Sequence, residues 1–221
     1  MKTIITSIAM ILVTTLSFAQ LKGSGKTISK TYDYQNFDKV FFDDLDGKLE
    51  IEVGKPFSVS ITIDDNLLDL LTVVEHSVNK TLTVALKGNR NNKMYIEDTK
   101  IKVKITMPFL MEVSNNGNSG LTVTNINSKY FKSNNPVNGS TTLSGIVDNL
   151  EVSCSGNGTL NAKQLVAKNA KIKATGNGNA YVNVNELITA KTSGNCTVIN
   201  SGKAKFNSVS SSSGNSRFVN N

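Results

Sequence analysis

The sequence of 221 residues has few of the residue types on which catalysis usually depends: no tryptophan, one histidine, two cysteines and three prolines. Because His76 is the only histidine, it is the only candidate base for a Ser-His-Asp triad. It lies in an alternating segment, residues 73–78, where we expect an exposed strand position. Without tryptophan the chain also lacks the largest aromatic surface for stacking on sugar rings. These absences argue against a catalytic site.

Acidic residues are scarce in the second half of the chain. Asp148, Glu151 and Glu186 are isolated from one another, whereas glycoside hydrolysis usually needs a pair of carboxylates. We therefore expect a protein that is not an enzyme and that has no catalytic residues and no cofactor. A polysaccharide-acting enzyme with its groove on a β-helix stays as the alternative.

One stretch does gather carboxylates, Asp43-Asp44-Leu45-Asp46-Gly47. It resembles a fragment of a calcium loop, but it lacks the spaced ligands and the closing glutamate that such loops need. We interpret it as a charged hairpin turn and expect no metal site.

The first 19 residues have the pattern of a signal peptide. Lys2 precedes an apolar run over residues 4–16, and Ser17-Phe18-Ala19 supplies small residues for cleavage after Ala19. The run is shorter than the stretch of about 20 apolar residues that a membrane-spanning helix needs, and no later apolar stretch is long enough either. We expect an exported protein without a transmembrane segment, located in the periplasm, on the outer surface or outside the cell.

The formal net charge of +7 could indicate a nucleic-acid partner. Many lysines, however, alternate with apolar residues, as they do over residues 100–105. This alternation is typical of a half-buried strand whose lysines lie on the solvent-exposed face. We therefore expect no nucleic-acid partner.

A recurring phrase organises the second half: a small hydroxylated residue, then glycine, then asparagine. The four strict copies end in Gly156-Asn157, Gly176-Asn177, Gly194-Asn195 and Gly214-Asn215, and a looser copy contains Gly117-Asn118. Successive glycines of the strict copies are 20, 18 and 20 residues apart. A repeat of about 20 residues with β-type alternation predicts a solenoid in which each repeat is one turn.

Short apolar pairs between the phrases suggest that each turn holds about three short strands separated by bends. Pairs such as Ala170/Ile172 and Leu187/Thr189 are expected to point inward and to stack on their counterparts in the next turn. We interpret the Gly-Asn phrases as structural corners, where glycine adopts left-handed backbone conformations and asparagine amides form a ladder along the axis. The turn containing Pro136 and Asn138-Gly139 departs from the phrase, so its register stays open.

The solenoid also bears on the two cysteines, Cys154 and Cys196. They lie two turns apart, a separation of about 9.6 Å at the usual strand spacing. A disulfide needs Cα atoms within about 7 Å. We therefore expect two separate, mostly buried thiols.

Before residue 113 the alternation predicts a hairpin-rich β region, preceded by a flexible lead-in over residues 20–29. The expected elements are a hairpin of residues 48–53 and 58–63, a short helical turn beginning at Asp64-Asp65, a hairpin of residues 72–78 and 81–86, a mobile loop at residues 88–92 and a strand at 100–107. The predicted organisation is a signal peptide (1–19), an alternating-strand region (20–112) and solenoid repeats (113–221).

Several stretches, in this order, resemble the bacterial family called putative auto-transporter adhesin, head GIN domain. They are Phe37-Asp38-Lys39-Val40, Leu49-Glu50-Ile51-Glu52-Val53-Gly54, Asp64-Asp65-Asn66-Leu67-Leu68, Leu82-Thr83-Val84, Val103-Lys104-Ile105-Thr106-Met107-Pro108 and the serial Gly-Asn phrases. The resemblance covers nearly the whole chain after residue 19. It implies an exported all-β protein with a right-handed β-helix part, an adhesin role and no catalytic residues. Family members usually have Asp where this chain has Asn157 and Asn177, so those corners lack the carboxylates that ion binding would need.

The expectation is an all-β protein whose C-terminal half is a right-handed β-helix or solenoid and whose N-terminal β-sheet part is packed on it or continuous with it. Its expected function is adhesin-like binding of an unidentified macromolecule or glycan at the cell envelope. A self-associating envelope scaffold, and hence a homo-oligomer, is a further alternative.

Overall fold

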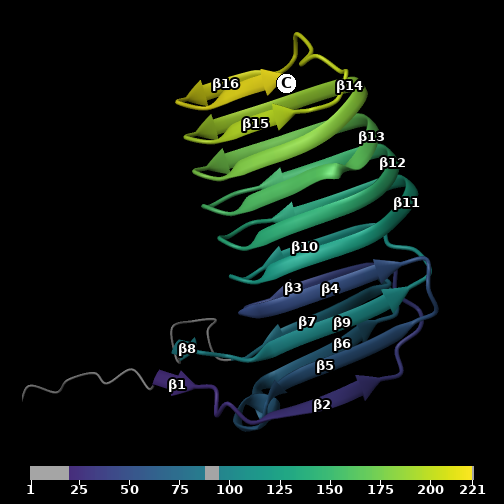
Figure 1. Ribbon diagram of the computed structural model, residues 1–221, viewed down its shortest axis with the longest axis vertical. Coiled ribbons are helices and arrows are strands. Elements are labelled where there is room, and N and C mark those ends of the chain that lie inside the picture. The colour runs from purple at the N-terminus through teal and green to yellow at the C-terminus, as the bar shows by residue number, and fades with distance from the viewer. Residues whose placement is uncertain (1–19, 88–94, 221) are drawn as a thin grey trace, which may run out of the picture.

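A computed structural model describes residues 20–87 and 95–220. The predicted signal peptide, and the loop predicted at residues 88–92, lie outside the described residues. Within them the chain is all-β, with one 15-stranded, mostly parallel sheet, one two-stranded sheet and one short 3-10 helix. Figure 1 shows the strands of the large sheet stacked along the long axis of the molecule.

The elements fall into two groups that the same large sheet joins. The N-terminal group is β1 (Gln20–Lys22), β2 (Thr27–Tyr32), β3 (Lys39–Asp43), β4 (Gly47–Val53), β5 (Ser58–Asp64), η1 (Asp65–Leu70), β6 (Leu71–His76), β7 (Thr81–Leu86), β8 (Tyr95–Glu97) and β9 (Ile101–Met107). The stacked group is β10 (Glu112–Asn116), β11 (Gly120–Asn135), β12 (Ser140–Cys154), β13 (Thr159–Gly176), β14 (Asn179–Gly194), β15 (Thr197–Asn200), β16 (Ser211–Gly214) and β17 (Arg217–Asn220).

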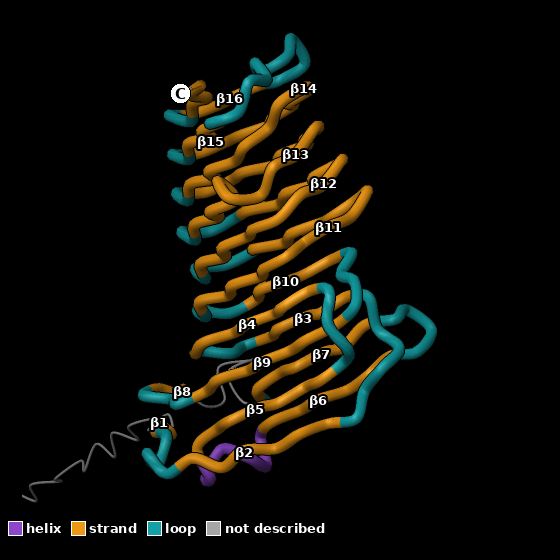
Figure 2. Tube along the Cα trace, turned by 45° about the vertical axis from the view of Figure 1, so that its right-hand side comes forward, coloured by secondary structure: helices purple, strands orange, loops and turns teal. Residues whose placement is uncertain are grey.

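The long strands β11 to β14 pair in parallel, each displaced along the sequence by about one repeat. Gly120 pairs with Ser140, Ser140 with Thr159 and Thr159 with Asn179. Along each strand alternate side chains are buried, because they point to opposite faces of the pleated backbone. Figure 2 shows that these strands bend as they run, so that successive layers follow the same path.

A register shift lies between β13 and β14, where the repeat is 18 residues long instead of 20. The pairing is regular up to Asn161↔Tyr181 and again from Asn169↔Leu187, with irregularities between. The shorter repeat therefore differs from its neighbours only in the bend, which has two residues fewer. In the regular stretch that follows, Ile188 pairs with the buried Ala170 and is buried, whereas Leu187 pairs with Asn169 and lies outside with half of its surface exposed. The prediction that the Leu187/Thr189 pair points inward was wrong, because the register aligns this pair with the outward positions of β13.

The strands of the N-terminal group do not pair in the order that alternation suggested. β4 pairs in parallel with β9 and β11, and β5 pairs antiparallel with β9 and β2. β9 therefore lies between β4 and β5, and the predicted hairpin of residues 48–53 and 58–63 does not form. The predicted hairpin of residues 72–78 and 81–86 does form, as the antiparallel pair β6 and β7, with its first strand ending at His76.

The stretch Asp43–Gly47 is not a hairpin turn either. β3 pairs with β7 and β10, whereas β4 pairs with β9 and β11, so the stretch is a bend between strands on different sides of the fold. These pairings also join the two groups directly. The predicted boundary at residue 112 falls inside β10, which pairs with β3 on one side and β11 on the other.

The predicted flexible lead-in is held by a buried carboxylate. Asp64 is fully buried and accepts hydrogen bonds from the backbone N–H groups of Gly25 (2.8 Å) and Lys100 (2.6 Å). The lead-in forms β1, part of β2 and the turn between them. Asp64 does precede the predicted helical turn η1, but its side chain makes no capping hydrogen bond to it.

Candidate functional site

The glycines of the strict repeat phrases lie at tight corners. Gly156, Gly176, Gly194 and Gly214 all have positive φ angles, between 69° and 93°. A Cβ atom on Gly176 would lie 2.5 Å from the carbonyl oxygen of Gly156, and one on Gly194 would lie 2.6 Å from that of Gly176. Each corner therefore packs backbone against backbone on the corner before it. Such packing leaves no cavity for a ligand.

The asparagines after these glycines form a chain of side-chain hydrogen bonds. Each Nδ2 atom donates to the Oδ1 atom of the preceding corner: Asn157 to Asn138 (3.1 Å), Asn177 to Asn157 (2.8 Å), Asn195 to Asn177 (2.9 Å) and Asn215 to Asn195 (3.0 Å). The ladder starts at Asn138, in the turn whose register the sequence left open. In the looser copy, Gly117 packs against Leu45, and Asn118 donates its backbone N–H to the Leu45 carbonyl.

The two thiols are buried and free, in agreement with the sequence-based expectation. Burial, and to a lesser extent the neighbouring Cys196, raises the pKa of the Cys154 thiol to about 12. Cys196 Sγ donates to the carbonyl of Ala174 at 3.3 Å. Because the thiolate is the reactive form, Cys154 is an inert core residue.

His76 lies on β6, at one end of the large sheet, and is exposed, as its alternating context predicted. In the described part of the chain no three histidine, cysteine, aspartate or glutamate side chains form a group that could hold a metal ion. None of its helices is long and apolar enough to cross a membrane.

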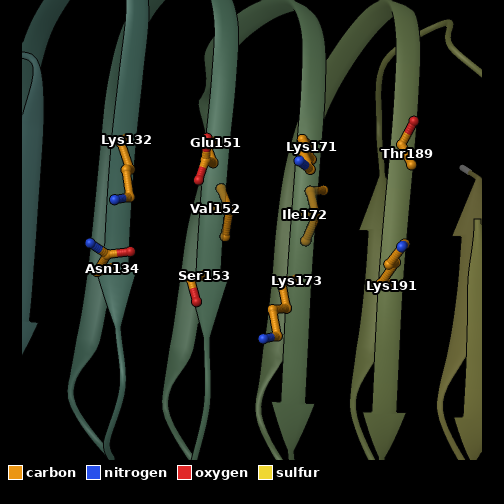
Figure 3. Close-up of a pocket in the computed structure, with 10 residues that line it drawn as sticks. All are labelled: Lys132, Asn134, Glu151, Val152, Ser153, Lys171, Ile172, Lys173, Thr189 and Lys191. Atoms are coloured by element: carbon orange, nitrogen blue, oxygen red, sulfur yellow. The ribbon is translucent and has the colours of Figure 1, made fainter.

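A shallow groove, by contrast, runs over the outward-facing side chains of β11 to β14. Its main part is a hollow of ≈ 470 Å³, joined to a second hollow of ≈ 350 Å³ that shares Glu151, Lys171 and Thr189 with it. Figure 3 shows the main part, with side chains from four neighbouring strands lying in two rows. We call this surface the β11–β14 groove.

Register places the groove residues in three rows across the strands. The first row is Tyr130, Asn149, Asn169 and Leu187; the second is Lys132, Glu151, Lys171 and Thr189; the third is Asn134, Ser153, Lys173 and Lys191. Members of one row are about 4.8 Å apart, the spacing of neighbouring strands. A chain-like ligand lying across the strands would therefore meet a new side chain at each strand.

The first row combines two apolar side chains with a pair of amides. Tyr130 and Leu187 are 39% and 51% exposed, and Asn169 Nδ2 donates to Asn149 Oδ1 between them at 3.1 Å. The Tyr130 hydroxyl donates to Glu151 Oε2 at 2.9 Å. Partial burial, followed by this hydrogen bond, raises the Tyr130 pKa to about 12, so the phenol stays a hydrogen-bond donor at neutral pH.

The charges of the groove change along its length. At the β11 end, Lys132 pairs with Glu112 at 3.1 Å, and Asn134 donates to the same carboxylate at 2.8 Å. Towards β14 come Lys171, Lys173 and Lys191, which form no ion pair with a carboxylate of the described chain. Four lysines and one glutamate line the main hollow, so its charge is positive.

Sequence reasoning did not single out any groove residue as a binding residue. Alternating segments contain Lys171, Lys173 and Lys191. From the sequence we interpreted such segments simply as solvent-exposed faces of strands. That interpretation was right for each strand, but it could not show that three such lysines come together. Only the register of β13 against β14 places Lys173 next to Lys191.

The fold and the groove together define an all-β protein with a mostly parallel sheet and a polar, basic groove on one face. The chain belongs to the family described as putative auto-transporter adhesin, head GIN domain, whose model matches residues 36–204. The resemblance seen in the sequence is thereby confirmed. A search of the curated proteins finds none that matches.

Two solved structures are similar over most of both chains. A protein of Bacteroides fragilis, described as a putative adhesin, is 19% identical with a TM-score of 0.62, and the match covers 90% of this chain and 98% of that one. A protein of Parabacteroides distasonis, described as a putative lipid binding protein, is 19% identical with a TM-score of 0.51, covering 91% and 99%. At this identity the likeness shows a common fold.

Proposed function

We propose that the protein is an exported, non-catalytic β-solenoid that binds a glycan or another extended macromolecule at the cell envelope, in the manner of an adhesin. The observation that carries the proposal is the β11–β14 groove, whose rows repeat at the strand spacing. Membership of a family described as adhesin heads supports the same role.

The architecture supports this proposal because it suits an extended ligand. Parallel pairing displaced by about one repeat fits a right-handed β-helix, with the Gly-Asn phrases as its structural corners. Such a coil is stiff and presents long flat faces. Amides, hydroxyls and amino groups on one face can make many weak hydrogen bonds with a chain that lies along it.

The test is a glycan and protein array probed with residues 20–221. A ligand found there is then titrated against the double variant Tyr130→Ala/Leu187→Ala, which removes the two apolar side chains of the groove. We expect its affinity to fall by about 10-fold or more, as befits the loss of one or two buried apolar contacts. The matched control is Tyr181→Ala/Ile199→Ala, a paired tyrosine and aliphatic residue on β14 and β15, outside the groove. Equal losses of affinity in both variants would show that the groove is not the binding surface.

A polysaccharide-acting enzyme is the second candidate, favoured by one observation. The groove gathers Glu151 with several lysines, and charged groups converging in one cleft are what such an enzyme needs. The carboxylate, however, is a single one and accepts the Tyr130 hydroxyl. Incubation with neutral and acidic polysaccharides, followed by a reducing-end assay, decides the matter. Release of new ends that stops in a Glu151→Gln variant would replace the binding role by a catalytic one.

A further inference from the structure

We propose that the β11–β14 groove takes an acidic polysaccharide, whose carboxylate or sulfate groups are bound by Lys171, Lys173 and Lys191. This inference rests on the proposed function and names the chemical class of its ligand. The three lysines come from two neighbouring strands, β13 and β14, and all are exposed.

The first argument is that the three groove lysines have no carboxylate partner among the described residues. Some surface lysines lie beside carboxylates, such as Lys48 with Glu50 at 2.7 Å and Lys168 with Asp148 at 2.7 Å, and others that form no such pair within the described chain, such as Lys30 and Lys104, do not line the β11–β14 groove. The three groove lysines form no such pair among the described residues, although like charges at adjacent strand positions repel each other. An anionic ligand would supply the missing counter-charges.

The second argument is spacing. Lys173 and Lys191 are register partners, so their strands place them about 4.8 Å apart, and Lys171 lies two residues from Lys173 on β13, about 6.6 Å away. The three lysines thus occupy neighbouring positions of the second and third rows on β13 and β14 (Figure 3). A single phosphate or carboxylate would engage one or two of them, whereas a chain with repeated anionic groups could engage all three.

The third argument is what surrounds the lysines. Ser153, Thr189 and Asn134 present hydroxyl and amide groups to the same hollow, and Tyr130 lies at its rim. Sugar rings offer the hydroxyl groups that these side chains can bind. Glu151 adds a negative charge to the β11–β14 groove, and this charge disfavours a densely charged polymer such as nucleic acid. A glycan that alternates neutral and anionic groups fits this mixture better.

The experiment measures binding of residues 20–221 to immobilised hyaluronate and κ-carrageenan, which carry one carboxylate and one sulfate per disaccharide respectively, and to neutral dextran and duplex DNA. The test variant is Lys171→Gln/Lys173→Gln/Lys191→Gln, and the matched control is Lys26→Gln/Lys30→Gln/Lys104→Gln, which removes three exposed lysines outside the groove. Both variants lose the same net charge. A third variant, in which the groove lysines become arginine, keeps the charge, and thermal melts check that all variants fold.

We expect the protein to bind at least one acidic glycan in preference to dextran. The groove variant should weaken this binding about 10-fold or more, the control variant less than about 2-fold, and the arginine variant little. Raising the salt concentration should weaken wild-type binding more than binding by the groove variant. The two acidic glycans distinguish a carboxylate ligand from a sulfate ligand.

Other outcomes separate the two proposals. Binding to neutral dextran that the groove variant keeps would overturn this inference and leave the proposed function standing. Equal losses in the groove and control variants, or DNA binding as tight as glycan binding, would show general charge attraction and also overturn it. If neither these polymers nor any arrayed glycan or protein binds, both proposals fail.

Discussion

Strands β2 to β9 pair in both directions, whereas β10 to β17 pair only in parallel, and apart from Phe131 the largest fully buried side chains belong to the N-terminal group. The N-terminal core contains Phe37, Phe42 and Met107, all fully buried. Among the described residues, every buried alanine lies at or after Ala162. In the stacked part each turn lies directly on the backbone of the one before, which limits the size of side chains.

The largest expected effect tests this difference at two glycines. Gly176 and Gly54 both have positive φ, at 93° and 86°, but a Cβ atom would clash with the neighbouring turn only at Gly176, since at Gly54 nothing lies within 4 Å. Gly176→Ala should cost about 2–5 kcal/mol, from backbone strain and overpacking together. Gly54→Ala should cost about 1–2 kcal/mol, from strain alone. Urea unfolding of both variants measures the difference, and equal costs would contradict close stacking of the corners.

A smaller effect concerns the tight core around Cys154. Its pKa in the folded protein, about 12, lies above the ordinary thiol value of 9.0, so only the unfolded chain ionises between them. The thiol's contribution to stability is complete below about pH 9 and is lost as the pH rises towards 12, at roughly 1.4 kcal/mol per pH unit. Melting at about pH 8 and about pH 10 should show a larger drop for wild type than for Cys154→Ala. Equal drops would mean that the thiol is accessible to water.

The smallest effect separates the amide ladder from an ordinary exposed asparagine. Asn177 donates to Asn157 and accepts from Asn195, so Asn177→Ala removes two hydrogen bonds. Because they are exposed, the expected loss is about 0.5–1.5 kcal/mol in all. Asn118→Ala is the control, since among the described residues only its backbone N–H makes a hydrogen bond, and it should change the free energy of unfolding little. A loss as large for Asn118 would show that the ladder adds no stability.

The same contrast explains what could be predicted from the sequence. In the stacked part the partner of each strand is the next repeat, so the repeat spacing was enough to predict the buried thiols and most inward residues. In the N-terminal part the alternation of Leu49, Ile51 and Val53 is the same whether β5 or β9 lies beside it. Pairing there depends on residues about 50 positions apart, and nothing local in the sequence reports it. The groove was missed for the same reason, because it exists only through cross-strand register.

The register shift in the bend of β13 has a consequence for the evolution and engineering of this protein. A repeat two residues shorter than its neighbours still keeps Asn195 hydrogen-bonded to Asn177 and Thr159 paired with Asn179. Insertions and epitope tags should therefore be tolerated between Lys163 and Gln164, which are exposed and lie where the pairing is already irregular. On a flat side, by contrast, an insertion or deletion of one residue would displace every later side chain of that strand to the opposite face. Homologues should accordingly differ in length at this bend and keep the flat sides constant.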